Sequence, residues 1–157
     1  MRINIRKLII SIAIPLIVGG TAAFFTRDSM MQFESMNQPP LSPPSWLFPV
    51  MWTILYMLMG ISSYLISEST ASKEAIEDAQ TIYYFQLGLN FLWPLLFFGL
   101  NWYLVAFLEL VALWISVAVM IRRFLDISPL AAYLNVPYLI WLTFAAYLNL
   151  GVWWLNR

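Results

Sequence analysis

Five long apolar stretches alternate with short polar connections along the 157 residues of the chain. Each stretch is close to the roughly 20 residues that a helix needs to cross the hydrocarbon core of a bilayer. We therefore predict an all-α membrane protein, a single bundle of five transmembrane helices, with spans over residues 8–26, 46–67, 81–100, 102–121 and 129–154. No linker divides the sequence, so residues 1–157 are expected to form one domain.

The first stretch has a second interpretation. Arg2, Arg6 and Lys7 precede an apolar run that ends in small residues, a pattern that also occurs in cleaved signal peptides. Because the chain begins at Met1, we expect this segment to be retained as a transmembrane helix.

The connections differ in length and character. Residues 27–45 are stiffened by four prolines, Pro39, Pro40, Pro43 and Pro44. We predict that this long first loop caps one end of the bundle, although a rigid connector or a polyproline ligand would have a similar sequence. The other connections are residues 68–80, expected to extend a helix into solvent, residues 99–101, which close a hairpin, and residues 122–128.

Lysine and arginine gather on one side of the predicted bundle. That side carries Arg2, Arg6, Lys7, Lys73, Arg122 and Arg123. Only Arg27 and Arg157 lie on the side of the Pro-rich loop. Since cytoplasmic loops carry the excess of basic residues, we expect an integral protein of a bacterial cell membrane with its N-terminus in the cytoplasm.

Composition supports lipid as the solvent and narrows the chemistry. Hydrophobic residues make up 62% of the chain and charged residues 10%, against about half and a quarter in soluble domains. The formal net charge is zero, so no basic field argues for a nucleic-acid partner. The sequence has no Cys and no His, which excludes disulfides, thiol nucleophiles, Ser-His-Asp triads, Cys/His zinc sites and the usual haem ligands. We expect no metal site and no resident cofactor.

Aromatic residues make up 17% of the chain and include eight tryptophans. Trp46, Trp102, Trp153 and Trp154 lie near predicted span ends, where indole rings commonly anchor a protein at the interface. Trp52, Trp93, Trp114 and Trp141 lie inside spans, where the alternatives are core packing, contact with lipid, or a binding site.

Three sets of residues at helical spacing place a large ring beside a polar or small group. They are Trp52 with Tyr56, Asn90 with Trp93, and Trp141 with Ala145 and Asn149. If these faces converge, they form an aromatic slot with amides inside it, which suits a flat apolar ligand with polar edges. The two asparagines would equally suit hydrogen bonds that hold the helices together, and both roles are compatible.

Two further features are candidates for function or packing. Glu109 is the only acid inside a predicted span, and such a residue is by default a functional hypothesis, with a protonated structural donor or a carboxyl near a wet cavity as the alternatives. Gly19 and Ala23 have the small-x-x-x-small spacing that permits close helix contact, within the chain or in a dimer.

Three blocks of the sequence resemble the translocator protein family, also called the tryptophan-rich sensory protein or peripheral-type benzodiazepine receptor family. The blocks are PPLSPPSWLFPVMWTILYMLMGISSYLI, NFLWPLLFFGLN and VPYLIWLTFAAYLNLGVWWLN. They stand in family order and spacing, so the resemblance covers essentially the whole chain. The first loop departs from the family pattern: Gln32 and Phe33 replace Trp-Tyr, Gln38 replaces Lys, and Leu41 replaces Trp.

The resemblance implies a bundle, often a homodimer, that binds porphyrins such as protoporphyrin IX beneath the first loop. The family's pocket positions correspond to Trp52, Asn90, Trp93, Trp141, Ala145 and Asn149. Some bacterial members are described as degrading protoporphyrin in light with pocket tryptophans, which correspond here to Trp52 and Trp141. A sterol site is not expected, because Tyr147 and Arg157 are too far apart for that family motif.

These expectations lead to a receptor or scavenger that binds porphyrins, with light-dependent degradation as an open enzymatic reading. The sequence offers no conventional nucleophile–base pair. The alternative is a transporter of porphyrin or another small apolar solute. Against transport, the sequence shows no internal repeat and no interrupted pair of helices.

Overall fold

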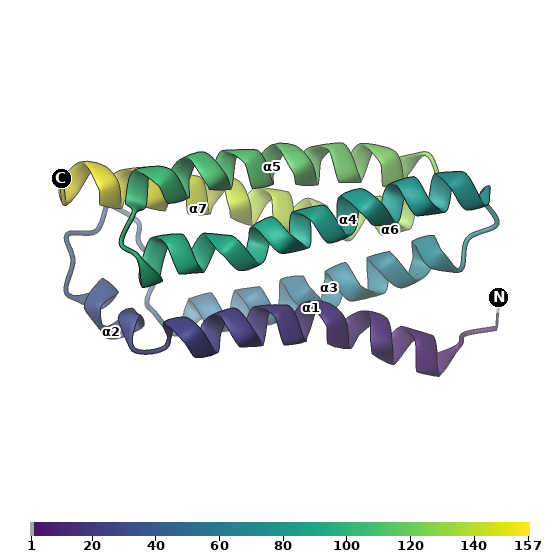
Figure 1. Ribbon diagram of the computed structural model, residues 1–157, viewed down its shortest axis with the longest axis horizontal. Helices are drawn as coiled ribbons and strands as arrows, with labels where there is room; N and C mark the ends of the chain where they lie inside the picture. Colours follow the sequence, from purple (N-terminus) through teal and green to yellow (C-terminus); the bar gives the residue numbers. More distant parts are fainter. Residues whose placement is uncertain (1) are drawn as a thin grey trace.

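The computed structural model describes residues 2–157 and shows a bundle of membrane-spanning helices (Figure 1). Within the described residues, five segments are long and apolar enough to cross a membrane, and this confirms the predicted fold class. The helices are α1 (Ile5–Thr26), α2 (Ser29–Glu34), α3 (Leu47–Ser67), α4 (Lys73–Pro94), the π-helix η1 (Leu95–Gly99), α5 (Tyr103–Leu125), α6 (Pro129–Tyr133) and α7 (Val136–Leu155).

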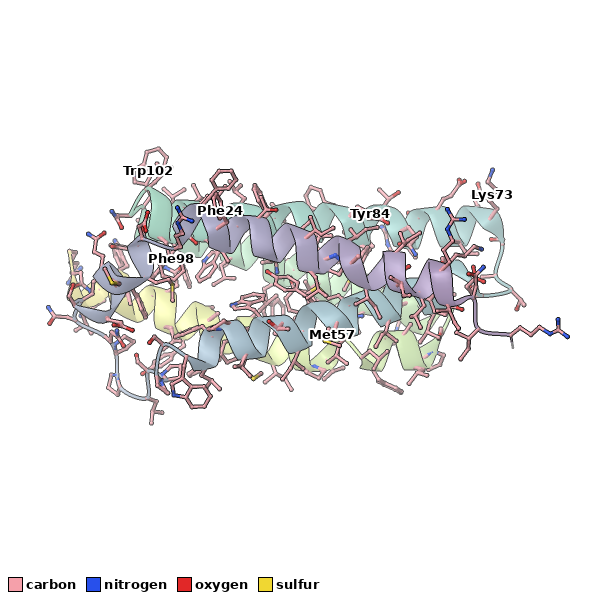
Figure 2. All side chains as sticks on the ribbon, turned by 90° about the horizontal axis from the view of Figure 1, so that it is seen from below. Phe24, Met57, Lys73, Tyr84, Phe98 and Trp102 are labelled. Atoms are coloured by element: carbon pink, nitrogen blue, oxygen red, sulfur yellow. The ribbon has the colours of Figure 1, made fainter. Side chains whose placement is uncertain are left out.

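The long helices lie side by side, with α2 and the C-terminus at one end and the N-terminus at the other (Figure 1). The most extensive packing joins α1 to α3, α4 to α5 and α5 to α7. We call the two ends the α2 end and the N-terminal end. In Figure 2, the labelled residues Phe24, Phe98 and Trp102 lie toward the α2 end, and Lys73 lies at the N-terminal end.

Local chemistry explains where several helices begin. The Asn4 side chain accepts a hydrogen bond from the Lys7 amide at the start of α1, and Ser72 accepts one from the Ala75 amide at the start of α4. The α4 helix therefore starts eight residues before the predicted third span. Residues 73–80 of the polar segment form the helical extension that the sequence predicts, whereas residues 68–72 form a turn.

The fifth span is not the continuous helix that the sequence predicts. The α6 helix ends at Tyr133 and α7 begins at Val136, because Pro137 has no N–H to donate to the Tyr133 carbonyl. Buried Asn135 bridges this break by donating from Nδ2 to the Ala131 carbonyl, at 3.0 Å, and to the Ser62 hydroxyl, at 2.7 Å. The break is thus anchored to α3.

A second irregularity follows Pro94 at the α2 end. Five residues form the π-helix η1, whose pattern closes with a hydrogen bond of 3.0 Å from the Leu100 amide to the Leu95 carbonyl. The two irregular stretches lie at opposite ends of the bundle, so they are not a facing pair of broken helices at mid-membrane.

The first loop lies over the α2 end, where the sequence predicts a cap (Figure 1). Phe33 of α2 is buried and meets Phe48, Phe97 and Phe98 edge to face, with ring centroids 5.7 to 6.0 Å apart. The Tyr147 hydroxyl donates to the Pro40 carbonyl at 2.6 Å, which ties the Pro-rich segment to α7.

Candidate functional site

A cavity of about 480 Å³ lies between α1, α2, α3 and the end of α4. Its apolar lining comes mainly from small residues of α1, methionines of α2 and aromatic rings of α3 and α4. Of the seven residues predicted for ligand binding, four line it: Trp52, Tyr56, Asn90 and Trp93. A cavity with this volume and lining is typical of a site for a small ligand.

Stacked rings give the cavity its flat walls. Trp52 and Tyr56, one helical turn apart on α3, stack with ring centroids 5.6 Å apart and planes inclined by 26°. Trp93 of α4, which also lines the cavity, stacks on Phe97 of η1 with ring centroids 5.3 Å apart and planes inclined by 25°. The spacing that predicted a shared face for Trp52 and Tyr56 therefore also sets the surface that a flat ligand would meet.

Small residues of α1 make the third wall. Gly19 and Ala23 both line the cavity. A Cβ atom at Gly19 would lie 2.1 Å from the Tyr56 ring, so this position must be glycine for the ring to fit. The small-x-x-x-small pattern thus serves close packing within the chain.

The floor of the cavity is polar and buried. The Tyr56 hydroxyl donates to Asn90 Oδ1 at 2.7 Å, and Asn90 Nδ2 donates to the Tyr138 hydroxyl at 2.7 Å. Asn90 therefore joins α3 to α7 through α4, as expected for a residue that holds helices together, and it also lines the cavity.

The other three predicted residues lie directly behind the cavity wall. The Trp141 ring meets Trp52 edge to face, with centroids 6.4 Å apart. Asn149 accepts a hydrogen bond of 3.0 Å from Trp93 Nε1 and donates one of 2.7 Å to the Tyr103 carbonyl. Ala145 is buried on the same helix. The seven residues thus form one group, with α3 and α4 facing the cavity and α7 supporting them.

Charged residues stand at the rim, beneath and within the first loop. Arg27 and Glu34 both line the cavity. The Arg27 guanidinium lies 4.4 Å from the centroid of the Phe24 ring, and the Glu34 carboxylate accepts a hydrogen bond from the Ser45 hydroxyl. The mouth of the cavity is therefore the wet, polar end of an otherwise apolar site.

The four first-loop residues that depart from the family pattern differ in where their side chains lie. Phe33 turns inward and packs against η1, whereas Gln32 is exposed. Leu41 has a left-handed backbone with φ of 67° and is 85% exposed. Gln38 donates to the Phe33 carbonyl at 3.0 Å and so braces the loop. None of these four residues lines the cavity, so the substitutions change the cap and leave the walls intact.

Sequence reasoning missed several residues of the site. Phe48 lines the cavity and lies four residues before Trp52, so helical spacing could have found it. Met30 and Met31 line it from α2, which no periodic pattern predicted. Glu109 lies elsewhere: it is buried on α5 and is not among the lining residues.

Known proteins resemble this chain along nearly its whole length. Residues 11–155 match the model of the TspO/MBR family. The chain is 38% identical to the tryptophan-rich protein TspO of Archaeoglobus fulgidus over 154 residues, which cover 98% of this chain and 99% of that protein. It is 38% identical to protein CrtK of Rhodobacter capsulatus, over 88% of this chain and 85% of that protein. It is 40% identical to the translocator protein of Ovis aries, over 85% of this chain and 80% of that protein.

Proposed function

Because this chain belongs to the TspO/MBR family of membrane proteins, we propose that it is a receptor or scavenger that binds porphyrins such as protoporphyrin IX. The observation that carries the proposal is the cavity of about 480 Å³ beneath the first loop, with stacked aromatic walls and a polar floor. A porphyrin is flat and apolar with polar substituents at its edge. It can stack on the ring pairs while its charged edge stays at the rim.

Two features favour stacking over metal coordination as the means of binding. The sequence has no His and no Cys, the usual axial ligands of haem iron. The cavity is instead lined by the indole rings of Trp52 on α3 and Trp93 on α4. The proposed ligand is therefore held by dispersion and by hydrogen bonds at its edges.

Truncation of a wall ring tests this site. A base stacked on an aromatic side chain is worth about 1–3 kcal/mol by alanine substitution, and a porphyrin offers a larger face. Trp52→Ala should therefore weaken binding of protoporphyrin IX at least about tenfold. The measurement is titration of the purified protein with protoporphyrin IX, followed by quenching of tryptophan fluorescence and corrected for the lost fluorophore.

The matched control is Trp102→Ala. Trp102 is 55% exposed at the start of α5 and does not line the cavity, so its removal should leave affinity within about twofold of the parent value. If Trp52→Ala binds protoporphyrin IX as tightly as Trp102→Ala does, the cavity is not the porphyrin site.

A second activity is proposed for the same cavity: degradation of the bound porphyrin in light, with dissolved dioxygen as the oxidant. The observation that favours it is the contact between Trp52 and Trp141, whose indole rings meet 6.4 Å apart, one at the cavity and one behind it. Trp52→Phe and Trp141→Phe should keep most affinity and lose light-dependent loss of porphyrin absorbance. Equal loss of absorbance by the parent and the double variant would exclude this activity and leave binding unaffected.

We also propose that the protein forms a homodimer, as the family resemblance implies. A shallow apolar groove between α1 and α4 offers one surface for a second copy. At Gly88, which lines this groove, no described residue lies within 4 Å of an added Cβ, so another helix can approach the backbone closely there.

A further inference from the structure

The charged side chains of the cavity lining are gathered at its mouth. Among residues 2–157, the lining contains one basic residue, Arg27, and one acidic residue, Glu34. Arg27 directly follows α1 and Glu34 ends α2, so both belong to the α2 end (Figure 1). A charged group on a ligand can therefore meet a charge of opposite sign only at this end of the cavity.

The negative charge at the mouth is engaged by the first loop. The Glu34 carboxylate accepts a hydrogen bond from the Ser45 hydroxyl, which joins α2 to the residues just before α3. Glu34 also lines a second hollow, which the loop itself forms with Gln38 and Ser42. Its carboxylate thus helps to hold the loop in place.

The positive charge at the mouth has no comparable partner. Among residues 2–157, the carboxylate within 4.0 Å of Arg27 is Asp28, whose Oδ1 lies 3.9 Å from Nε and so beyond hydrogen-bond distance. The guanidinium instead rests on the Phe24 ring, with its central carbon 4.4 Å from the ring centroid. Because the N–H donors lie in the plane of the guanidinium, a contact with its face leaves them available to another molecule.

The spacing along α1 sets this cation across the cavity from its floor. The Tyr56 ring packs at Gly19, and Arg27 follows eight residues later on the same side of the cavity. At the helical rise of 1.5 Å per residue, the two positions are roughly 12 Å apart, which is comparable to the width of a tetrapyrrole ring. A flat ligand whose inner edge meets Tyr56 and Asn90 would therefore bring its outer edge to Arg27.

We propose that Arg27 determines the specificity of the cavity by binding a carboxylate on the outer edge of a flat aromatic ligand. A carboxylate matches this residue because two parallel N–H groups of a guanidinium can donate to its two oxygens. The inference rests on the proposed function of the cavity as a porphyrin site. It adds the charge that the ligand carries at the mouth and the residue that recognises this charge.

Protoporphyrin IX and its dimethyl ester test the role of charge with a single macrocycle. The free acid carries two ionised propionates at neutral pH, whereas both are neutral in the ester. Each compound is titrated into the purified protein in a non-ionic detergent at about 0.1 M salt, and binding is followed by quenching of tryptophan fluorescence. Because the two compounds partition differently into micelles, each variant is compared with the parent protein separately for each compound.

Arg27→Gln removes the positive charge and keeps a side chain that can donate hydrogen bonds. An exposed ion pair contributes up to about fivefold to an equilibrium constant, so this variant should bind the free acid about fivefold more weakly than the parent. Its affinity for the ester should stay within about twofold. Arg27→Glu should weaken binding of the free acid further, to about tenfold or more, because it sets a carboxylate against the propionates.

Arg157→Gln is the matched control. Arg157 is the other basic residue of the α2 end, its guanidinium lies 3.5 Å from the centroid of the Trp154 ring, and it does not line the cavity. The substitution removes the same charge from the same end of the bundle. The affinities for the free acid and for the ester should therefore both stay within about twofold of the parent values.

Salt provides a measurement that a purely steric role of Arg27 would not change. Raising the salt concentration from about 0.1 M to about 1 M shortens the screening length from about 10 Å to about 3 Å. The affinity of the parent for the free acid, relative to the ester, should fall toward that of Arg27→Gln. The relative affinity of Arg27→Gln itself should change by less than about twofold.

The role of Arg27 and the proposed function can fail separately. If Arg27→Gln binds the free acid as tightly as the parent does, or loses the ester to the same extent as the free acid, Arg27 does not recognise the carboxylate. If Trp52→Ala weakens binding of both compounds while Arg27→Gln weakens neither, the porphyrin site stands and only the role of Arg27 is wrong. If Trp52→Ala leaves both affinities unchanged, both proposals are wrong.

Discussion

Polar side chains inside the bundle fall into two groups at the scale of single residues. Tyr56, Asn90, Tyr138 and Gln86 bond to one another across three helices, and each link is between 2.7 and 2.8 Å. Glu109 belongs to the second group: it is buried, and neither carboxyl oxygen has a hydrogen-bond partner among residues 2–157. Two members of the first group, Tyr56 and Asn90, line the cavity. Glu109 has no partner among the described residues that would offset the free-energy cost of burying a carboxylate.

The substitution Glu109→Gln tests whether the buried site on α5 needs a carboxyl group. A buried carboxylate without a partner is costly at membrane depth, so an uncharged group of the same shape should fit the site at least as well. Glu109→Gln should fold with an unchanged or higher Tm in detergent and bind protoporphyrin IX like the parent.

The control for that substitution is Ser116→Ala on the same helix, where the hydroxyl donates only to the Ala112 carbonyl one turn earlier. A folded Glu109→Gln protein that has lost porphyrin binding, beside a Ser116→Ala protein that has kept it, would assign Glu109 a direct role in the ligand site.

At the scale of helices, the contact between α1 and α3 holds one side of the cavity together. The two helices approach closely at Gly60, where an added Cβ would lie 2.4 Å from Ile12 Cα and 2.6 Å from the Ser11 carbonyl oxygen. These atoms belong to the backbone, so they cannot turn aside as a flexible side chain would. Nearer the α2 end, the same pair of helices supplies Gly19 and Tyr56 to the cavity.

Alanine at Gly60 should therefore push α1 away from α3. Overpacking a close contact costs about 1–3 kcal/mol, so Gly60→Ala should lower the free energy of unfolding by that amount and reduce the Tm. The measurement is thermal unfolding in detergent, followed by circular dichroism.

Gly20→Ala is the matched control, because no atom of residues 2–157 lies within 4 Å of a Cβ added at that position of α1. Alanine is the better helix former, so this variant should unfold at the parent temperature or slightly above it. Equal Tm values for the two variants would show that Gly60 is not a contact that limits packing.

The sequence predicted the helices well and their irregularities poorly. Span lengths follow from the thickness of the hydrocarbon core, which is a constraint that every membrane helix shares. The break before Val136 depends on Pro137 together with a buried partner, Asn135, that reaches α3. Proline alone did not distinguish a kink from a break, since Pro15 lies inside the unbroken helix α1. Whether a proline breaks a helix therefore depends on contacts with neighbouring helices.

The candidate site was also predicted in part: spacing along one helix predicted some of it, and contacts between helices decided the rest. Helical spacing placed Trp52 beside Tyr56, and the structure stacks the two rings. Spacing along one helix could not show that Trp141, Ala145 and Asn149 stand behind the wall of the cavity, because this depends on how far α7 lies from α3. For the same reason it could not connect Tyr138 to Asn90, which are 48 residues apart in the chain.

At the scale of the whole molecule, the cavity occupies one half of the bundle. Among residues 2–157, the cavity lining on α3 and α4 ends at Tyr56 and Asn90 toward the N-terminal end. The other half, toward the N-terminal end, is closed by the contact at Gly60 and by the hydrogen bonds of Asn135 to Ser62 and Ala131. A site that opens near one end and is closed at the other favours a receptor over a transporter.

The two ends also differ in charge, and this predicts how the protein sits in the membrane. Arg2, Arg6, Lys7, Lys73, Arg122 and Arg123 belong to the N-terminal end, and Arg27 and Arg157 belong to the α2 end. Within the described residues, three of the six have acidic partners: Lys7 pairs with Glu68 at 2.7 Å, Lys73 with Glu77 at 3.5 Å, and Arg123 with Asp78 at 2.8 Å. Orientation follows lysine and arginine more than net charge, so these pairs should not cancel the bias. The cavity would then face away from the cytoplasm.

Single cysteines can test this orientation, because the natural sequence has none. Ser35 lies in the exposed part of the first loop at the α2 end, and Thr70 is exposed in the turn between α3 and α4 at the other. With a maleimide that cannot cross membranes, Ser35→Cys should be labelled on intact cells and Thr70→Cys only after the cells are permeabilised. Labelling of both from outside would contradict the bundle of five spans, since the two positions flank the single span α3. Labelling of Thr70→Cys alone on intact cells would keep the bundle and invert it, which would place the mouth of the cavity on the cytoplasmic side.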